Sequence, residues 1–169
     1  DNHGLEESEY TKLSLNEDCF FCVYDGMGGG DFGEIASYTA AKSTQKYLSV
    51  KTNINPCDIT PSLEKMCVSV NEAVYEAGNN LGSSQMGSTL VGLYFHAGQT
   101  WICNLGDSRC YLLRNRKMRQ ISEDHTDEEF MKKNGITGRK PYLTQYLGID
   151  PKEMEVVPFV KSYYLNKGD

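Results

Sequence analysis

The sequence contains no long run of apolar residues and no concentration of basic residues. No stretch is long or apolar enough to span a bilayer, and no signal peptide is visible, so we expect no membrane partner. The 17 Lys and Arg residues are outnumbered by 23 Asp and Glu residues, which gives a formal charge of −6. Without a basic stripe, nucleic acid is not an expected partner. The 169 residues, 39% of them hydrophobic, are typical of one globular domain with a core.

The cysteines do not form a recognisable metal or disulfide pattern. Cys19 and Cys22 have the spacing of a zinc-ligand pair, but they lie in an apolar run, and no second Cys or His pair completes four ligands. We interpret the six cysteines as reduced core residues of a protein in a reducing compartment. This predicts a cytoplasmic location.

The most informative segment is residues 23–30, where a lone acid, Asp25, separates an apolar run from a glycine-rich stretch. The run over residues 19–24 is typical of a short buried strand. A carboxylate at the end of a core strand needs a strong partner, usually a cation, and glycines let the backbone bend or another group approach closely. The segment therefore predicts a metal site. It lacks the Lys-Ser/Thr of a P-loop, which argues against a nucleotide-binding loop.

Hydrophobic periodicity predicts two helices followed by an antiparallel meander. Helical spacing covers residues 32–48 and 60–77, with Pro61 at the start of the second helix. Strands are predicted over residues 19–24, 88–95, 100–105, 109–114, 118–122 and 155–159, and a short helix over residues 127–133. This pattern indicates an α+β domain whose sheet packs against a second sheet or against the helices.

Four short motifs follow one another along the chain, and each is weak by itself. They are Asp25-Gly26-Met27-Gly28-Gly29, Gly87-Ser88-Thr89, Asn104-Leu105-Gly106-Asp107-Ser108-Arg109 and Ser122-Glu123-Asp124-His125-Thr126. In order and spacing this set resembles the metal-dependent protein serine/threonine phosphatases of the PPM (type 2C) family. Residues 32–37 and 143–148 add to the resemblance, which covers nearly the whole chain. Met27, where animal members usually carry His, resembles the bacterial branch.

The resemblance implies an α+β fold, a two-sheet antiparallel β-sandwich flanked by helices in four α/β/β/α layers, incomplete in this chain. It implies a single phosphatase-like domain over residues 1–169 that lacks the first and last segments of the family domain. The implied activity is hydrolysis of phosphoserine and phosphothreonine on proteins by a metal-activated water, with substrates supplied by a serine/threonine kinase. A second hypothesis is a catalytically inactive binding or regulatory module on the same fold.

The resemblance also assigns candidate site residues. Asp25 would be the catalytic residue and bridge two Mn²⁺ or Mg²⁺ ions, and the carbonyl of Gly26 would bind one of them; both donors are oxygens, which hard cations prefer. Asp124 matches the acid that holds a further, weaker metal ion in bacterial relatives. Asp1 matches the last acid of an earlier metal motif. Because only these acids of the family's site are matched, we expect this chain alone to bind metal weakly. No substrate-binding residue is assigned.

The remaining motif residues are predicted to have structural roles. Asp107 and Arg109 resemble a structural ion pair at a tight turn. Gly87-Ser88-Thr89 predicts either a close backbone contact near the site or packing alone. His125 could be a site residue or part of a turn cap.

Overall fold

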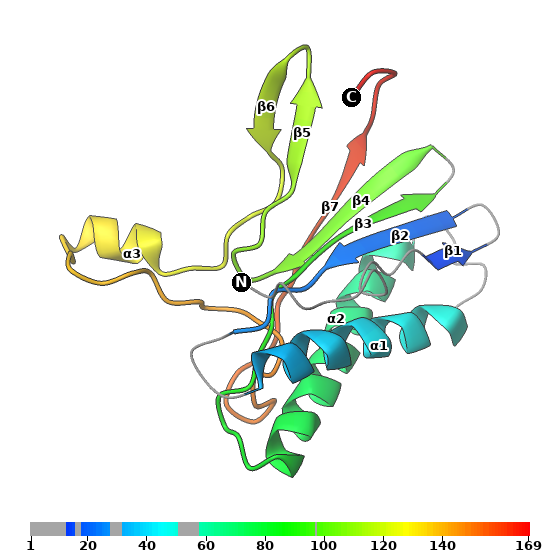
Figure 1. The fold of residues 1–169 in the computed structure, drawn as a ribbon. Helices are drawn as coiled ribbons and strands as arrows, with labels where there is room; N and C mark the ends of the chain where they lie inside the picture. The colour runs from blue at the N-terminus through cyan, green and yellow to red at the C-terminus, as the bar shows by residue number, and fades with distance from the viewer. Residues whose placement is uncertain (1–12, 16–17, 28–31, 51–57, 97) are drawn as a thin grey trace.

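The computed structural model describes residues 13–15, 18–27, 32–50, 58–96 and 98–169. Figure 1 shows an antiparallel main sheet, two long helices against one of its faces, and a β-hairpin and a short helix that project from it. The sheet has five strands in the spatial order β1-β2-β3-β4-β7. These strands are β1 (Leu13–Leu15), β2 (Asp18–Val23), β3 (Leu90–His96), β4 (Gln99–Leu105) and β7 (Phe159–Tyr164).

Strand β2 shows how the sheet separates its two faces. Phe20 and Cys22 are buried, whereas Phe21 and Val23 are exposed, as the alternation of side chains along a strand requires. The register pairs Cys22 with Gly92 on β3. A Cβ at Gly92 would lie 2.7 Å from the ring of Phe20, so a glycine is needed for this aromatic side chain to cover the neighbouring strand.

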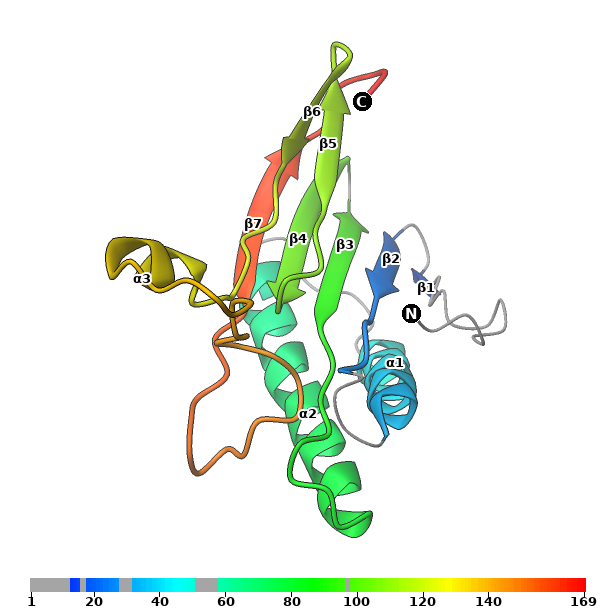
Figure 2. The ribbon, with the colours of Figure 1, turned by 60° about the vertical axis from the view of Figure 1, so that its left-hand side comes forward.

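The two long helices, α1 (Gly33–Val50) and α2 (Ile59–Asn80), cover the face of the sheet that carries Phe20 (Figure 2). Their buried residues recur at helical spacing, as the sequence predicts. Helix α1 begins one residue later than predicted, and both helices end slightly beyond their predicted C-terminal ends. The core joins small residues of α1 to larger residues of α2 and the sheet, including Ala36, Ala40, Met66, Val70, Val74, Tyr94 and Trp101. No described helix is long and apolar enough to cross a membrane.

A separate hairpin follows the main sheet. Strands β5 (Tyr111–Arg114) and β6 (Lys117–Gln120) are joined by Asn115 and Arg116, whose φ angles are 52° and 61°. Positive φ at both central residues is the conformation that a two-residue hairpin turn of matching twist requires. The hairpin was predicted at this point of the sequence, with slightly longer strands.

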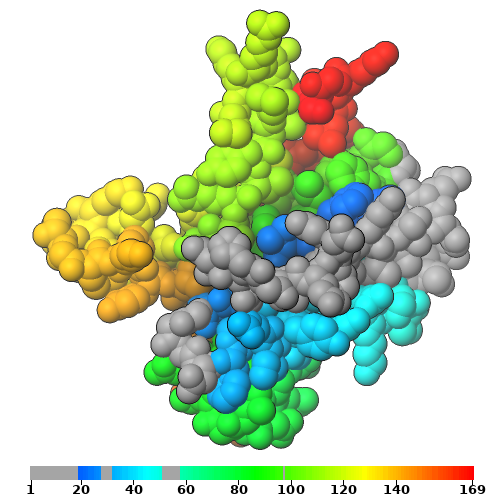
Figure 3. All heavy atoms as spheres, in the orientation of Figure 1, coloured from blue at the N-terminus to red at the C-terminus, as the bar shows by residue number. Residues whose placement is uncertain are grey.

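The short helix α3 (Glu128–Lys133) belongs to a lobe that stands away from the rest of the molecule (Figure 3). Asp127 joins the two chain segments where this lobe begins and ends. The Asp127 N–H donates to the Tyr142 carbonyl at 3.0 Å, and the Asp127 carboxylate accepts from the Tyr142 N–H at 2.7 Å. The Arg139 guanidinium pairs with Asp127 and lies 4.2 Å from the centre of the Tyr142 ring. This ion pair holds the pKa of Asp127 below its ordinary value.

The predicted fold class is confirmed, since antiparallel strands are flanked by helices. In the described part of the chain the two long helices lie against the main sheet, and β5 and β6 pair only with each other. The predicted position of the last strand is wrong, because β7 begins only at Phe159. The side chain of Gln145 binds the Glu155 carbonyl at 3.2 Å and the Val157 N–H at 2.9 Å, so these backbone groups are satisfied without a neighbouring strand.

Thr44 provides a test of the core under α1. Its side chain is fully buried and lies beside the Tyr24 hydroxyl, and neither hydroxyl forms a hydrogen bond of normal geometry in the described structure. We expect Thr44→Val to leave the free energy of unfolding unchanged or to raise it by up to about 1 kcal/mol, since a methyl group replaces an unsatisfied hydroxyl. Urea denaturation measures the free energy of unfolding of both proteins. A lower value for the valine variant would show that the threonine hydroxyl forms a hydrogen bond in solution.

Candidate functional site

Segments that are far apart in the sequence meet at one end of the main sheet. Ser88 forms isolated β-bridges with both Gly26 and Leu147, and the Gly106 carbonyl accepts a hydrogen bond from the His125 N–H at 3.0 Å. The structure therefore brings the described residues of the four motifs, together with residues 143–148, to one place. The segments that meet are residues 24–27, 87–89, 104–109, 122–126 and 143–148.

Asp25 lies two residues after the end of β2, with an exposed side chain. Its backbone is held on both sides: its N–H donates to Thr89 Oγ1 at 3.1 Å, and its carbonyl accepts from the Thr89 N–H at 2.9 Å. The single proton of the Ser88 hydroxyl is shared between the Asp25 carbonyl at 3.2 Å and the Thr89 carbonyl at 2.9 Å. Its carboxylate has no hydrogen-bond or ion-pair partner among the described residues. The acid is thus presented from a fixed backbone with both oxygens available.

Gly26 sits in the turn between β2 and α1. A Cβ at this position would lie 1.9 Å from the carbonyl oxygen of Gly33, at the start of α1, so only glycine fits between the turn and the helix. No described residue donates a hydrogen bond to the Gly26 carbonyl. This oxygen is therefore open to a ligand, and the metal-binding role that the resemblance implies for it stays a prediction.

Asp124 is engaged by two neighbouring side chains. Arg109 Nε lies 3.1 Å from Oδ1 and 2.8 Å from Oδ2, its Nη2 also binds Oδ2, and Gln120 Nε2 donates to Oδ1 at 2.7 Å. The carboxylate of Asp124 raises the pKa of the Arg109 guanidinium. The prediction of an ion pair between Asp107 and Arg109 is wrong, because the Arg109 guanidinium binds Asp124 instead. The pair is partly exposed and so adds little stability by itself.

His125 and Asn104 fasten the loop of Asp124 to the end of β4. The Gly106 N–H donates to His125 Nδ1 at 3.3 Å, which fixes this nitrogen as the acceptor. Burial lowers the pKa of His125, so the neutral ring is favoured. Asn104 is buried, and its side chain donates to the Glu123 carbonyl at 2.8 Å and accepts from the Glu123 N–H at 3.3 Å. Asn104 opens one of the four motifs but was given no role from the sequence, although a polar residue in the apolar run of β4 was the available signal.

The donor atoms partly fit a site for Mn²⁺ or Mg²⁺. The Asp25 carboxylate and the Gly26 carbonyl are available oxygens of the kind that these cations prefer. Asp124 would have to leave Arg109 before it could bind a cation, and Asp1 lies outside the described residues. No three His, Cys, Asp or Glu residues come together within the described ranges. These ranges therefore supply part of a ligand set.

The comparisons with known proteins point to one class. The sequence matches the family Protein phosphatase 2C over residues 1–130. The serine/threonine phosphatase stp of Listeria monocytogenes serovar 1/2a is 34% identical, and the alignment covers 96% of this chain and 67% of the relative. The corresponding protein of Listeria innocua is 33% identical over the same shares.

Solved structures agree on the fold. A crystal structure of a bacterial serine phosphatase has a TM-score of 0.79 at 22% identity, with 96% of this chain and 69% of that chain covered. The catalytic domain of the serine threonine protein phosphatase PstP, solved in complex with 2 manganese ions, has a TM-score of 0.68 at 23% identity, with 95% and 68% covered.

The family match and the relatives, with the fold in agreement, place the chain in the class of metal-dependent phosphatases that act on proteins. The chain belongs to the protein phosphatase 2C family, and the enzyme is a protein serine/threonine phosphatase. The family predicted from the motifs is thereby confirmed, together with its bacterial relatives. The chain spans about two thirds of the length of the Listeria proteins that it matches.

Proposed function

We propose that Asp25 is the central ligand of this phosphatase and bridges two Mn²⁺ or Mg²⁺ ions, with the Gly26 carbonyl binding one of them. The observation that carries the proposal is the exposed Asp25 carboxylate, which has no described partner while its backbone is bonded on both sides. When bound, such ions would supply a water of lowered pKa and neutralise phosphate charge. The chain itself contributes the two oxygen ligands and their fixed position.

Asp124 is proposed as the ligand of a further, weaker ion. Its present bonds to Arg109 and Gln120 support a weak site, because a cation has to replace the guanidinium before it can bind the carboxylate. Asp1 is proposed as an additional ligand from the resemblance alone. Asp124 and Asp1 thus remain secondary to Asp25 in the mechanism.

The proposed substrates are proteins that a serine/threonine kinase has phosphorylated, and the proposed location is the cytoplasm. We further propose that residues 1–169 form part of a single phosphatase domain. Neither nucleic acid nor a membrane enters the proposal. The inactive-module hypothesis gains no support from a particular observation in the described residues, since the Asp25 carboxylate is intact and accessible.

Metal removal tests this function directly. We expect the complete protein, supplied with Mn²⁺, to release phosphate from a phosphothreonine peptide, to lose this activity in EDTA, and to regain it when Mn²⁺ is restored, because ions held by Asp25 and Gly26 would supply the activated water. A malachite-green assay measures the phosphate, and a phosphotyrosine peptide serves as the control substrate. Undiminished hydrolysis in EDTA would contradict the mechanism, and equal rates on both peptides would contradict the substrate class.

A further inference from the structure

We infer that Thr89 and Ser108 are positioning residues of this site, whose paired hydroxyls hold the backbone at Asp25 and link it to the loop that carries Arg109. The inference rests on the proposed function, since it concerns Asp25 as a metal ligand. Neither hydroxyl has to touch metal or substrate. Both hydroxyls act by fixing the direction in which the Asp25 carboxylate points.

Thr89 holds Asp25 through two atoms. Its N–H donates to the Asp25 carbonyl at 2.9 Å, and its Oγ1 accepts from the Asp25 N–H at 3.1 Å. Both backbone polar groups of Asp25 are thereby fixed, and with them the direction of its Cα–Cβ bond. Thr89 is only 2% exposed, so water cannot readily take the place of its hydroxyl. Sheet pairing would provide the first of these bonds with any residue type, but the second requires a side-chain hydroxyl.

Ser108 continues this contact. Its Oγ lies 2.6 Å from Thr89 Oγ1, and either hydroxyl could be the donor. Because Thr89 Oγ1 already accepts from the Asp25 N–H, its own proton is free to point toward Ser108. Each hydroxyl thus orients the other, and hydrogen bonds in such a chain strengthen one another.

The methyl group of Thr89 has a separate role. Gly106 has a φ of +96°, and a Cβ at this position would lie 2.7 Å from Thr89 Cγ2. The loop therefore packs directly against the methyl group, while the hydroxyl faces Asp25 and Ser108. Valine would keep this packing and lose the hydrogen bonds, whereas serine would keep the bonds and lose the packing. The two substitutions separate positioning from simple burial.

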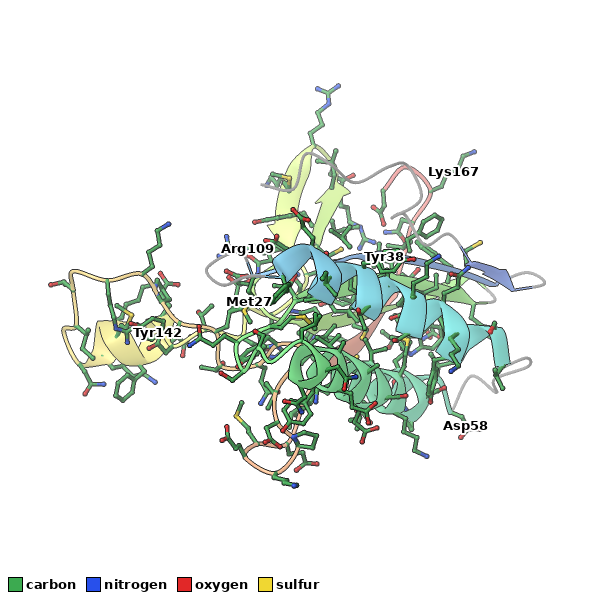
Figure 4. All side chains as sticks on the ribbon, turned by 60° about the horizontal axis from the view of Figure 1, so that its bottom comes forward. Met27, Tyr38, Asp58, Arg109, Tyr142 and Lys167 are labelled. Atoms are coloured by element: carbon green, nitrogen blue, oxygen red, sulfur yellow. The ribbon has the colours of Figure 1, made fainter. Side chains whose placement is uncertain are left out.

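The hydroxyl pair also joins the two candidate metal-binding acids. Ser108 precedes Arg109, which binds the Asp124 carboxylate, so one series of contacts runs from Asp25 through Thr89 and Ser108 to Asp124. Arg109 also lines the same pocket as Val23, at the end of β2. Figure 4 shows Arg109 and Met27 at this end of the sheet, with Tyr142 far out on the α3 lobe.

The test uses Thr89→Val, Thr89→Ser and Ser108→Ala in the complete protein. Isothermal titration with Mn²⁺ and phosphopeptide kinetics are measured for each variant. We expect Thr89→Val to weaken Mn²⁺ binding by about 10-fold or more and to lower kcat without a comparable change in KM, as is typical when a group that orients a ligand is lost. Ser108→Ala should show a smaller loss of the same kind. Thr89→Ser should stay within about threefold of the wild type.

Thr44→Val is the matched control, because it makes the same change at a buried threonine whose hydroxyl has no partner; we expect wild-type Mn²⁺ affinity. Wild-type affinity and kcat in folded Thr89→Val would overturn the inference and leave the phosphatase function intact. Equal losses in the valine and serine variants would also overturn it, in favour of packing. If Thr89→Val does not fold, Ser108→Ala takes its place: wild-type Mn²⁺ affinity and kcat in that variant would overturn the inference. Failure of the wild-type protein itself to bind Mn²⁺ would instead refute the proposed function.

Discussion

Replacing Asp25 with alanine will lower kcat/KM for a phosphopeptide by more than about 100-fold, since loss of a metal ligand exceeds the effect of losing a group that merely orients one. The free energy of unfolding should change by less than about 0.5 kcal/mol, because the side chain is exposed and bonds to no other described residue. Activity and stability are thus expected to separate at this residue. Such a separation is characteristic of a group retained for function.

Phosphate release under saturating Mn²⁺ and urea denaturation measure the two effects on the same protein preparation. Asp25→Asn provides a closer replacement that keeps the shape and removes the charge, and it should lose activity as well. Glu76→Gln, an exposed acid on α2, is the matched control and should leave activity unchanged. Activity that survives Asp25→Ala would remove the basis of the assigned mechanism.

Replacing Asn71 with alanine will destabilise the protein by about 3 kcal/mol, because several buried hydrogen bonds disappear at once. Asn71 on α2 is 2% exposed. Its Nδ2 donates to the Ile149 carbonyl at 2.9 Å, and its Oδ1 accepts from the N–H groups of Gly148 and Ile149 at 2.8 Å and 2.9 Å. The segment held in this way contains Leu147, which bridges to Ser88 beside Asp25. The loss should therefore reach the site as well as the fold.

Urea denaturation gives the stability change, and Asn80→Ala, at the exposed end of α2, is the control with an expected change of less than about 0.5 kcal/mol. We expect Asn71→Ala also to weaken Mn²⁺ binding, since the bridge to Ser88 would be released. A stability loss below about 1 kcal/mol would show that other contacts hold residues 147–149 in place.

Residues with a local signature were predictable from the sequence. The apolar run before Asp25 identifies β2, and helical spacing identifies α1 and α2, because burial of one side of a regular element leaves a periodic pattern. The order of the short motifs identified the family. The prediction failed at residues 155–159, where an apolar stretch next to Pro158 reads as a strand, yet Gln145 takes the backbone hydrogen bonds.

The contacts within the site could not be predicted in the same way. Thr89 and Asp25 are 64 residues apart, and Arg109 and Asp124 are 15 residues apart. No local pattern in the sequence indicates that the residues of either pair are in contact. The partner of Arg109 illustrates this point: its neighbour Asp107 is closer in sequence, but the turn directs the guanidinium to the other loop. A side chain's choice between two nearby acids depends on loop geometry.

The sequence alone determined the class of the protein through its short ordered motifs, and it determined the helices, strands β2 to β6 and the acid that follows β2 through local periodicity and turn signals; it missed β1 and misplaced β7. Only the tertiary structure decided that the Asp25 carboxylate is unpaired within the described chain, that Arg109 pairs with Asp124, and that Thr89 binds both the backbone of Asp25 and the Ser108 hydroxyl. The physical reason is that hydrogen bonds and ion pairs form between groups that packing brings together, and packing joins segments that are distant in the sequence.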